Sequence, residues 1–231
     1  METSLVGTLQ FVLHKGEKLA GPRAETPTHY IAMGFDDDLS IAAHKFEGPK
    51  GTGALYVRRG TTLLAQLQGG SQERYRRAGT ENVAGAVGMG VALGLAVAER
   101  AETARRLRRL RERLRAALLA LPGVELTGHP VERLPGHLSL IVRDLDGSAL
   151  VVALDLDDLA VSSGSACASG STEPSHVLTA MGYPEDEARG ALRLSLGRTT
   201  TEAEVAAAAT LTAAAIERQR AGAAALAGEA A

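Results

Sequence analysis

"AAHKFEGPKGTGALYVRRG" runs from Ala42 to Gly60 and is the most informative stretch of the chain for its fold. An apolar run ends directly before His44 and Lys45, and glycines and a proline follow at once. Ala54–Arg59 then has the composition of a short strand bounded by glycine. The stretch therefore predicts a strand that ends at a lysine, a glycine-rich connection, and a second strand.

The chemistry of Lys45 has two readings on these residues alone. A solvated surface lysine is the default for an isolated motif. A lysine that acts as an amine nucleophile needs a partly desolvated strand end that faces a cleft, and Lys45 follows a strand-like run. His44 beside it can donate a hydrogen bond to a phosphate. Both readings stay open at this point.

The residues after this stretch predict alternating helices and strands. A long helix begins near Asn82, and its second half carries leucines at three- and four-residue spacing, Leu107, Leu110, Leu114 and Leu118. Seven arginines between Arg105 and Arg115 form the solvated face around that stripe. We expect strands at residues 137–145, 159–167 and 191–198, and helices at residues 147–158, 174–182 and 200–220. Ser148 is the expected cap of the first of these helices, and Thr201 with Glu204 forms a capping box at the last.

The only cysteine, Cys167, lies in "SSGSACASGS" (Ser162–Ser171). Buried structural cysteines normally lie among large apolar residues, whereas small and flexible residues surround this one. We therefore expect an exposed thiol on a mobile loop.

The composition is that of a globular protein and excludes several classes of partner. Of 231 residues, 45% are hydrophobic and 23% are charged, with a formal net charge of −2. Nothing global favours nucleic acid or a membrane surface. One cysteine excludes an internal disulfide framework and fits a reducing compartment. No signal peptide is recognisable, and the apolar stretch Val83–Ala98 is short of a membrane span. We expect a cytoplasmic protein without a metal site.

Four motifs in order resemble the cysteine desulfurase family, pyridoxal-phosphate enzymes related to class V aminotransferases. They are Ala42–Gly60, "GGSQERYRRAGTEN" (Gly69–Asn82), "SSGSACASGSTEPSHVL" (Ser162–Leu178) and "LRLSLGR" (Leu192–Arg198). The resemblance covers roughly residues 33–220 and is to the C-terminal part of the family. It implies an α/β chain of the PLP-dependent transferase fold type I, with a truncated cofactor domain followed by an α+β small C-terminal domain.

The resemblance also implies a role for each matching residue. Lys45 holds pyridoxal 5′-phosphate covalently, and His44 contacts its phosphate. Thr80 contacts the phosphate of the neighbouring subunit's cofactor, which implies a homodimer. Arg193 binds the carboxylate of the substrate L-cysteine through a planar, two-pronged contact that lysine could not make. Cys167 attacks the substrate sulfur and carries it as a persulfide.

The chain departs from the family at and before the lysine. Ala42 replaces the second serine of the family's S-x-S-x-H-K, which removes one phosphate hydroxyl. The aspartate that pairs with the pyridine nitrogen in the family has no counterpart, because Asp36, Asp37 and Asp38 lie too close to Lys45. The expected organisation is residues 1–32 unmatched, 33–100 a remnant of the large cofactor-binding domain, 101–220 the small domain with the cysteine loop, and 221–231 a frayed tail.

The sequence therefore predicts a cysteine desulfurase-like protein that passes sulfur from L-cysteine to an acceptor protein, in iron–sulfur cluster assembly or tRNA thiolation, and releases L-alanine. One alternative is a remnant of low or no activity that serves as an interaction module. Another is a different fold-type-I enzyme, an aminotransferase or a selenocysteine lyase. Intact Lys45, Cys167 and Arg193 favour the first, and the absent ring-binding residues favour the second.

Overall fold

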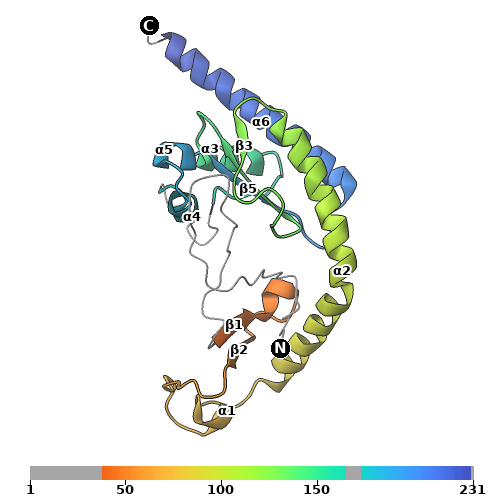
Figure 1. Ribbon diagram of the computed structural model, residues 1–231, viewed down its shortest axis with the longest axis vertical. Coiled ribbons are helices and arrows are strands. Elements are labelled where there is room, and N and C mark those ends of the chain that lie inside the picture. The colour runs from red at the N-terminus through yellow and green to blue at the C-terminus, as the bar shows by residue number, and fades with distance from the viewer. Residues whose placement is uncertain (1–37, 165–172, 230–231) are drawn as a thin grey trace. The chain divides into compact units, whose positions relative to one another are not determined.

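The computed structural model describes residues 38–164 and 173–229, which form two compact units (Figure 1). Within the described residues, unit 1 comprises residues 38–101 and unit 2 comprises residues 102–164 and 173–229. The expectation of an exposed, mobile Cys167 falls outside the described residues.

Unit 1 is built on one antiparallel strand pair. Strand β1 (Asp38–Ala42) pairs with β2 (Gly53–Val57), so that Ala42 lies opposite Gly53. The 3₁₀ helix η1 (Ala43–Phe46) follows β1 directly and ends at Glu47, whose φ of 65° is left-handed. Helix α1 (Gln72–Tyr75) is a single turn that includes residues with positive φ. The predicted strand–connection–strand pattern is confirmed.

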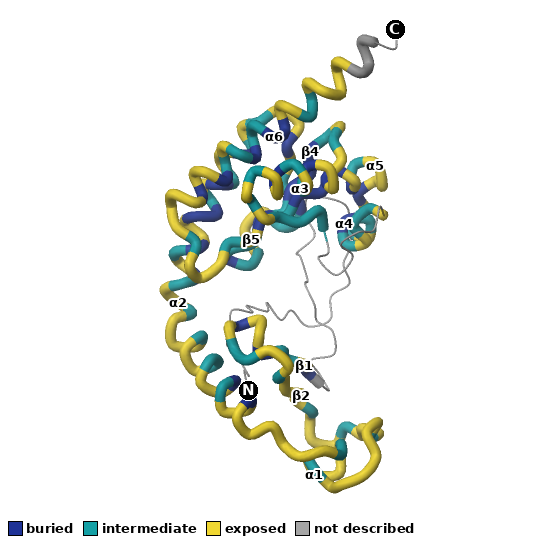
Figure 2. The backbone as a smooth tube through the Cα atoms, turned by 180° about the vertical axis from the view of Figure 1, so that it is seen from behind, coloured by how far each residue is buried: buried dark blue, intermediate teal, exposed yellow. Residues whose placement is uncertain are grey.

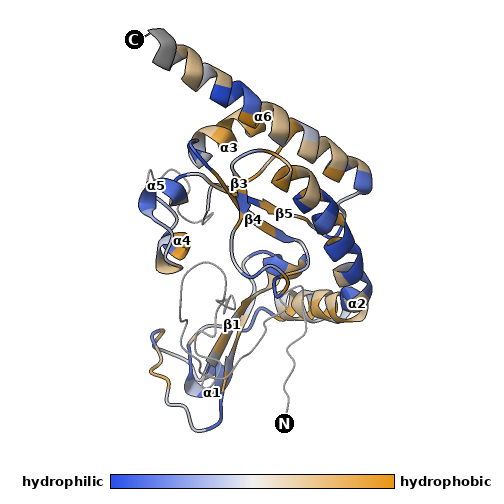
Figure 3. Ribbon diagram, turned by 45° about the horizontal axis from the view of Figure 1, so that its top comes forward, coloured by the Kyte–Doolittle hydropathy of each residue, from blue (hydrophilic) through white to orange (hydrophobic). Residues whose placement is uncertain are grey.

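Helix α2 (Val83–Leu119) begins where the sequence predicted it. The Asn82 side chain accepts a hydrogen bond from the Gly85 amide at 3.0 Å and so caps the helix. Its first half is apolar and its second half is rich in arginine (Figure 3). By length and composition α2 is able to cross a membrane. A single helix of this kind is weak evidence for a membrane protein.

Unit 2 contains a three-stranded antiparallel sheet with five helical segments around it. The strands lie in the order β3 (Val124–Leu126), β4 (His137–Val142), β5 (Ala191–Ser195). The second half of α2 is joined by α3 (Gly147–Asp155), α4 (His176–Ala180), α5 (Glu185–Ala188) and α6 (Glu202–Glu229). Both sheets of the described residues are antiparallel.

The main core of unit 2 lies on one face of this sheet. Leu138, Leu140 and Val142 of β4 are fully buried there. The same core contains Leu192 and Leu194 of β5 and residues of α2, α3 and α6, among them the predicted leucine stripe Leu110, Leu114 and Leu118. Buried positions accordingly concentrate in unit 2 (Figure 2). A smaller cluster on the other face joins Ile141 and Ala191 to residues of α4 and α5 and the turn between them.

The arginine run of α2 is only partly a solvated face. Arg111 is 5% exposed and donates to the Leu134 carbonyl at 3.1 Å. Arg106 donates to the Thr200 carbonyl at 2.5 Å, and Arg113 pairs with Glu202 at 2.7 Å. Several arginines thus fasten α2 to the start of α6 and to the loop before β4, which the charge pattern alone did not predict.

The capping box of α6 is confirmed. The Thr201 amide donates to Glu204 at 2.7 Å, and the Glu204 amide donates to the Thr201 hydroxyl at 3.2 Å. Hydrogen bonds from the backbone and hydroxyl of Thr201 hold the pKa of Glu204 below its ordinary value. The helix continues through residues 221–229, where the sequence predicted a frayed tail.

Two other local predictions are wrong. Asp146, not Ser148, caps α3, because its carboxylate accepts the Ser148 and Ala149 amides at 2.7 and 3.0 Å. The predicted strand at residues 159–167 is reduced, within its described part, to one bridge between Ser162 and Arg193.

Thr212 of α6 offers a direct test of the core. It is fully buried, and its hydroxyl has no hydrogen-bond partner among the described residues. An unsatisfied buried hydroxyl costs about 1–3 kcal/mol, and valine has nearly the same shape. We expect Thr212→Val to raise the free energy of unfolding by about 1 kcal/mol in urea denaturation. The control is Thr210→Val, an exposed position on the same helix. A destabilised Thr212→Val variant would show that the hydroxyl is bonded.

Candidate functional site

Helix η1 presents His44 and Lys45 by burying the residues on either side of them. Ala43 is fully buried and Phe46 is 5% exposed. Both pack with Met89 of α2 in the small core of unit 1. His44 and Lys45 occupy the intervening positions and are exposed. Lys45 follows the end of β1, as predicted, but its side chain is exposed and not partly desolvated as a nucleophilic lysine was expected to be.

Glycines of α2 allow the connection after η1 to approach the helix closely. A Cβ at Gly88 would lie 2.7 Å from the Pro49 ring, and a Cβ at Gly85 would lie 2.5 Å from the Thr52 hydroxyl. Both distances are shorter than real side chains tolerate. The "GPKGTG" connection therefore lies against α2 because these two positions lack side chains.

A matched pair of glycine substitutions tests this contact. Gly88→Ala places a methyl group against Pro49 and is expected to destabilise the packing of residues 43–52. Gly90→Ala on the same helix meets no atom within 4 Å and is expected to be neutral or stabilising by up to about 1 kcal/mol. Hydrogen exchange of residues 43–52 is the measurement. Equal protection in the two variants would show that the close approach of Pro49 to Gly88 does not hold this connection in place.

The other predicted residue of unit 1 is Thr80. It precedes α2 by three positions and is exposed. The Arg77 side chain donates to the Gly79 carbonyl beside it at 2.5 Å, which ties down the turn in which Thr80 lies. His44, Lys45 and Thr80 are thus all exposed side chains of unit 1.

Arg193 lies in unit 2, on the partly polar face of the sheet. It stands opposite Ser139 of β4, and the adjacent pair on the same face is His137 and Ser195. On its other side the backbone of Arg193 exchanges two hydrogen bonds with Ser162, at 2.7 and 3.1 Å. Pairing with β4 on one side and hydrogen bonds to Ser162 on the other therefore fix the backbone of Arg193.

The guanidinium of Arg193 is also held. Its Nε donates to the Gly164 carbonyl at 2.9 Å, and Nη1 lies 3.3 Å from the Ser195 hydroxyl. Gly164 has a φ of 138°, and a Cβ there would lie 3.2 Å from the Ser175 side chain. The segments that lead into and out of residues 165–172 therefore meet beside Arg193.

Burial and nearby positive charge both lower the pKa of His137. Burial, followed by the charges of Arg133, Arg193 and Arg111, lowers the pKa of His137 to about 4. The imidazole is therefore neutral at pH 7. Sequence reasoning missed His137, Gly164 and Ser195. The alternation along β4 and β5 could have found His137 and Ser195. Gly164 lies within the quoted motif Ser162–Leu178, but nothing local shows that its carbonyl contacts Arg193.

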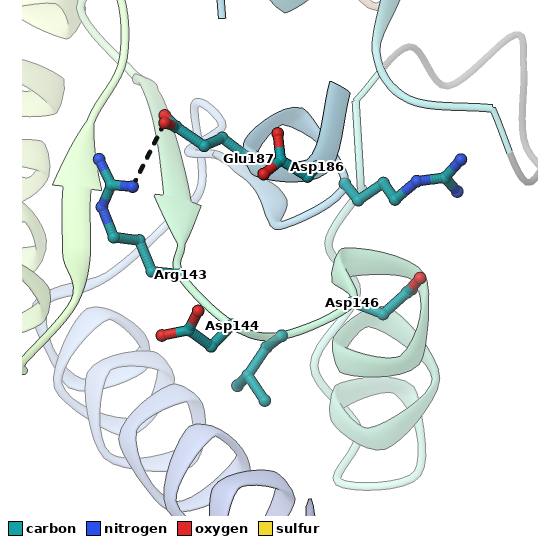
Figure 4. A pocket seen from close by; sticks show the side chains of 7 residues that line it. Arg143, Asp144, Asp146, Asp186 and Glu187 are labelled. Carbon is teal, nitrogen blue, oxygen red and sulfur yellow. Dashed lines mark ion pairs between the residues drawn. The ribbon is translucent and has the colours of Figure 1, made fainter. Parts of the chain in front are cut away.

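A cavity of about 390 Å³ in unit 2 contains none of the predicted residues (Figure 4). It is lined by Arg143, Asp144, Leu145, Asp146, Asp186, Glu187 and Arg189. Asp146 is engaged as the cap of α3, and Glu187 pairs with Arg143 at 3.4 Å. These groups stabilise the junction between β4 and α5. Among the described residues, no group of three or more histidine, cysteine or acidic side chains could hold a metal ion.

The residues of unit 1 have the chemistry to bind an aldehyde-bearing phosphate cofactor. An exposed primary amine can form a covalent bond with an aldehyde, and an imidazole and a hydroxyl can donate to a phosphate. Arg193 in unit 2 suits a carboxylate. The residues present therefore fit pyridoxal phosphate at its aldehyde and phosphate, whereas the sequence offers no partner for its ring nitrogen.

Comparison with known proteins agrees with this chemistry. The aminotransferase class-V family model matches residues 30–207. The chain belongs to this family. The family depends on pyridoxal phosphate, and members of the class share fold type I.

The similar curated proteins are cysteine desulfurases. The chain is 50% identical over 169 residues to cysteine desulfurase IscS of Methanosarcina thermophila, which covers 73% of this chain and 42% of the relative. It is 44% identical over 180 residues to cysteine desulfurase IscS of Dictyoglomus turgidum, covering 78% and 45%. The chain thus spans less than half the length of these two relatives and resembles their C-terminal part.

Solved structures give the same result. A NifS-like protein from Rickettsia africae matches with a TM-score of 0.71 and 31% identity, over 78% of this chain and 48% of that one. Another NifS-like protein matches with a TM-score of 0.67 and 36% identity, over 80% and 46%. The predicted family and fold are confirmed.

Proposed function

We propose that this chain forms the cofactor-anchoring and sulfur-carrying part of a cysteine desulfurase. The observation that carries the proposal is the placement of Lys45 on η1, directly after β1, at the position where the matching motif has its cofactor lysine. The similarity to cysteine desulfurases and the anchored arginine in β5 support it. The substrate would be L-cysteine.

Each proposed residue has a defined task. Lys45 holds pyridoxal phosphate through its amine, with His44 and a second protomer's Thr80 at the phosphate. Bound there, the cofactor would supply an electron sink for charge that develops at the substrate's α-carbon. Arg193 binds and orients the substrate carboxylate. The Lys45 amine is also the group suited to move the α-proton.

Sulfur transfer is assigned to Cys167. Its thiolate attacks the sulfur of L-cysteine, a sulfur–sulfur bond forms, and the carbon–sulfur bond of the substrate breaks. The electron pair of the broken bond stays with the carbon fragment, which takes up a proton and leaves as L-alanine. The persulfide on Cys167 then passes its outer sulfur to an acceptor protein. We extend the proposal to a cytoplasmic homodimer that serves iron–sulfur cluster assembly or tRNA thiolation.

The test is the sulfur on Cys167. Protein incubated with pyridoxal phosphate and L-cysteine is expected to gain one thiol-reducible sulfur atom, located on the Cys167 peptide by mass spectrometry. We expect the reaction to be slow, because no acidic partner for the ring nitrogen is recognisable in the sequence and the electron sink is weaker without one. Cys167→Ser should abolish the gain, and so should omission of the cofactor. Cofactor-independent sulfur on the protein, or none at all, would contradict the proposal.

A second candidate function rests on exposed apolar side chains of α2. Val83, Val87, Val91 and Leu95 recur every four residues and are 58–66% exposed. Contiguous apolar surface of this kind marks a protein–protein contact. An interaction module without catalysis would keep this surface and would not need Lys45. The sulfur measurement separates the two functions, because the module predicts no cofactor-dependent sulfur on Cys167.

A further inference from the structure

Arg193 is hydrogen-bonded to two residues outside its own strand, Ser162 and Gly164. Its backbone is bonded to Ser162, and its side-chain Nε donates to the carbonyl of Gly164, two residues further along. Among the described residues, no hydrogen bond involves Nη2 of Arg193. A guanidinium presents five N–H donors in a rigid plane. Fixing one edge of that plane through Nε therefore sets the direction of the remaining donors.

Gly164 provides this carbonyl in a conformation that other residues rarely adopt. Its φ of 138° lies in the region that favours glycine, and the space beside its Cα is filled by Ser175. An alanine at this position would be strained in its backbone and would press its Cβ against Ser175 at 3.2 Å. Relief of both strains requires the peptide unit that carries the Gly164 carbonyl to move.

We propose that Gly164 is a positioning residue for the substrate: its carbonyl fixes the Arg193 guanidinium in the orientation that receives the carboxylate. Ser195 assists through its hydroxyl at 3.3 Å from Nη1. This inference rests on the proposed function, because it takes the carboxylate of L-cysteine as the ligand of Arg193. The inference adds Gly164 to the residues that act on the substrate. A glycine has no reactive side chain, and its contribution here is a backbone carbonyl.

His137 provides an internal reporter for this site. Burial is the largest cause of the low pKa of His137, and the positive charges of Arg133, Arg193 and Arg111 lower it further. A carboxylate bound to Arg193 offsets one of these three charges. The imidazole should then take up a proton more readily when the ligand is bound.

The experiment uses the full chain and L-alanine, the product, as a carboxylate probe. Arginine Nε–H and histidine resonances are followed by NMR in wild type, Gly164→Ala and Gly182→Ala. Arg193→Gln identifies the Arg193 signal. Gly182 has a φ of 87° at the end of α4, so Gly182→Ala introduces comparable backbone strain at a glycine that is not bonded to Arg193.

The expected result is specific to Gly164. In wild type the Arg193 Nε–H exchanges slowly with solvent and L-alanine shifts its resonance. L-Alanine also raises the pKa of His137, which is followed in a pH titration around its value of about 4. In Gly164→Ala the Nε–H exchanges faster, and the apparent dissociation constant for L-alanine rises about tenfold, the loss expected for one hydrogen bond to a charged group. Gly182→Ala retains the wild-type values.

The other outcomes separate the inference from the proposed function. Equal L-alanine binding in wild type and Gly164→Ala would overturn the positioning role while leaving carboxylate binding by Arg193 intact. If L-alanine shifts neither Arg193 nor His137 in wild type, then the proposed substrate role of Arg193 is wrong and the positioning role is wrong with it.

Discussion

The packing of η1 against α2 is the contact on which the presentation of Lys45 depends. Ala43 and Phe46 are buried with Met89, and the glycines at positions 85 and 88 allow the following connection to lie against the helix. A four-residue 3₁₀ helix has too few hydrogen bonds to be stable alone. Its tertiary contacts therefore determine which side chains face outward, and those are His44 and Lys45.

A comparable constraint operates in unit 2 at Arg193. Buried leucines on either side of it hold β5 against the main core, so the arginine must lie on the opposite face of the sheet. Bonds to Ser162 and Gly164 then fix its backbone and its side chain. In both units, alternate burial along a short element exposes the residue that carries chemistry, and a glycine provides the close approach that keeps the element in place.

Local patterns predicted the parts of the fold that local physics determines. The leucine spacing of α2, the alternation of β5 and the Thr201–Glu204 box were all readable, because period and capping act within a few residues. Tertiary contacts decided the rest. Arg111 is buried although it lies in a charged run, and the run before the cysteine loop pairs only at Ser162 in its described part. The cap of α3 is Asp146, since an aspartate stood two residues before the serine that the sequence favoured.

The residues of the candidate site also fall into those that local patterns predicted and one that only a tertiary contact reveals. Ordered motifs pointed to Lys45, His44, Thr80, Cys167 and Arg193, whereas Gly164 was invisible because its contribution is a backbone carbonyl 29 residues away from Arg193 in sequence. The proposed function depends above all on Lys45 as the cofactor anchor. Its most direct test is borohydride reduction of protein mixed with pyridoxal phosphate, followed by peptide mapping. We expect a reduced adduct on Lys45, and an adduct that forms instead on Lys15, Lys18 or Lys50 would show that Lys45 is not the anchor.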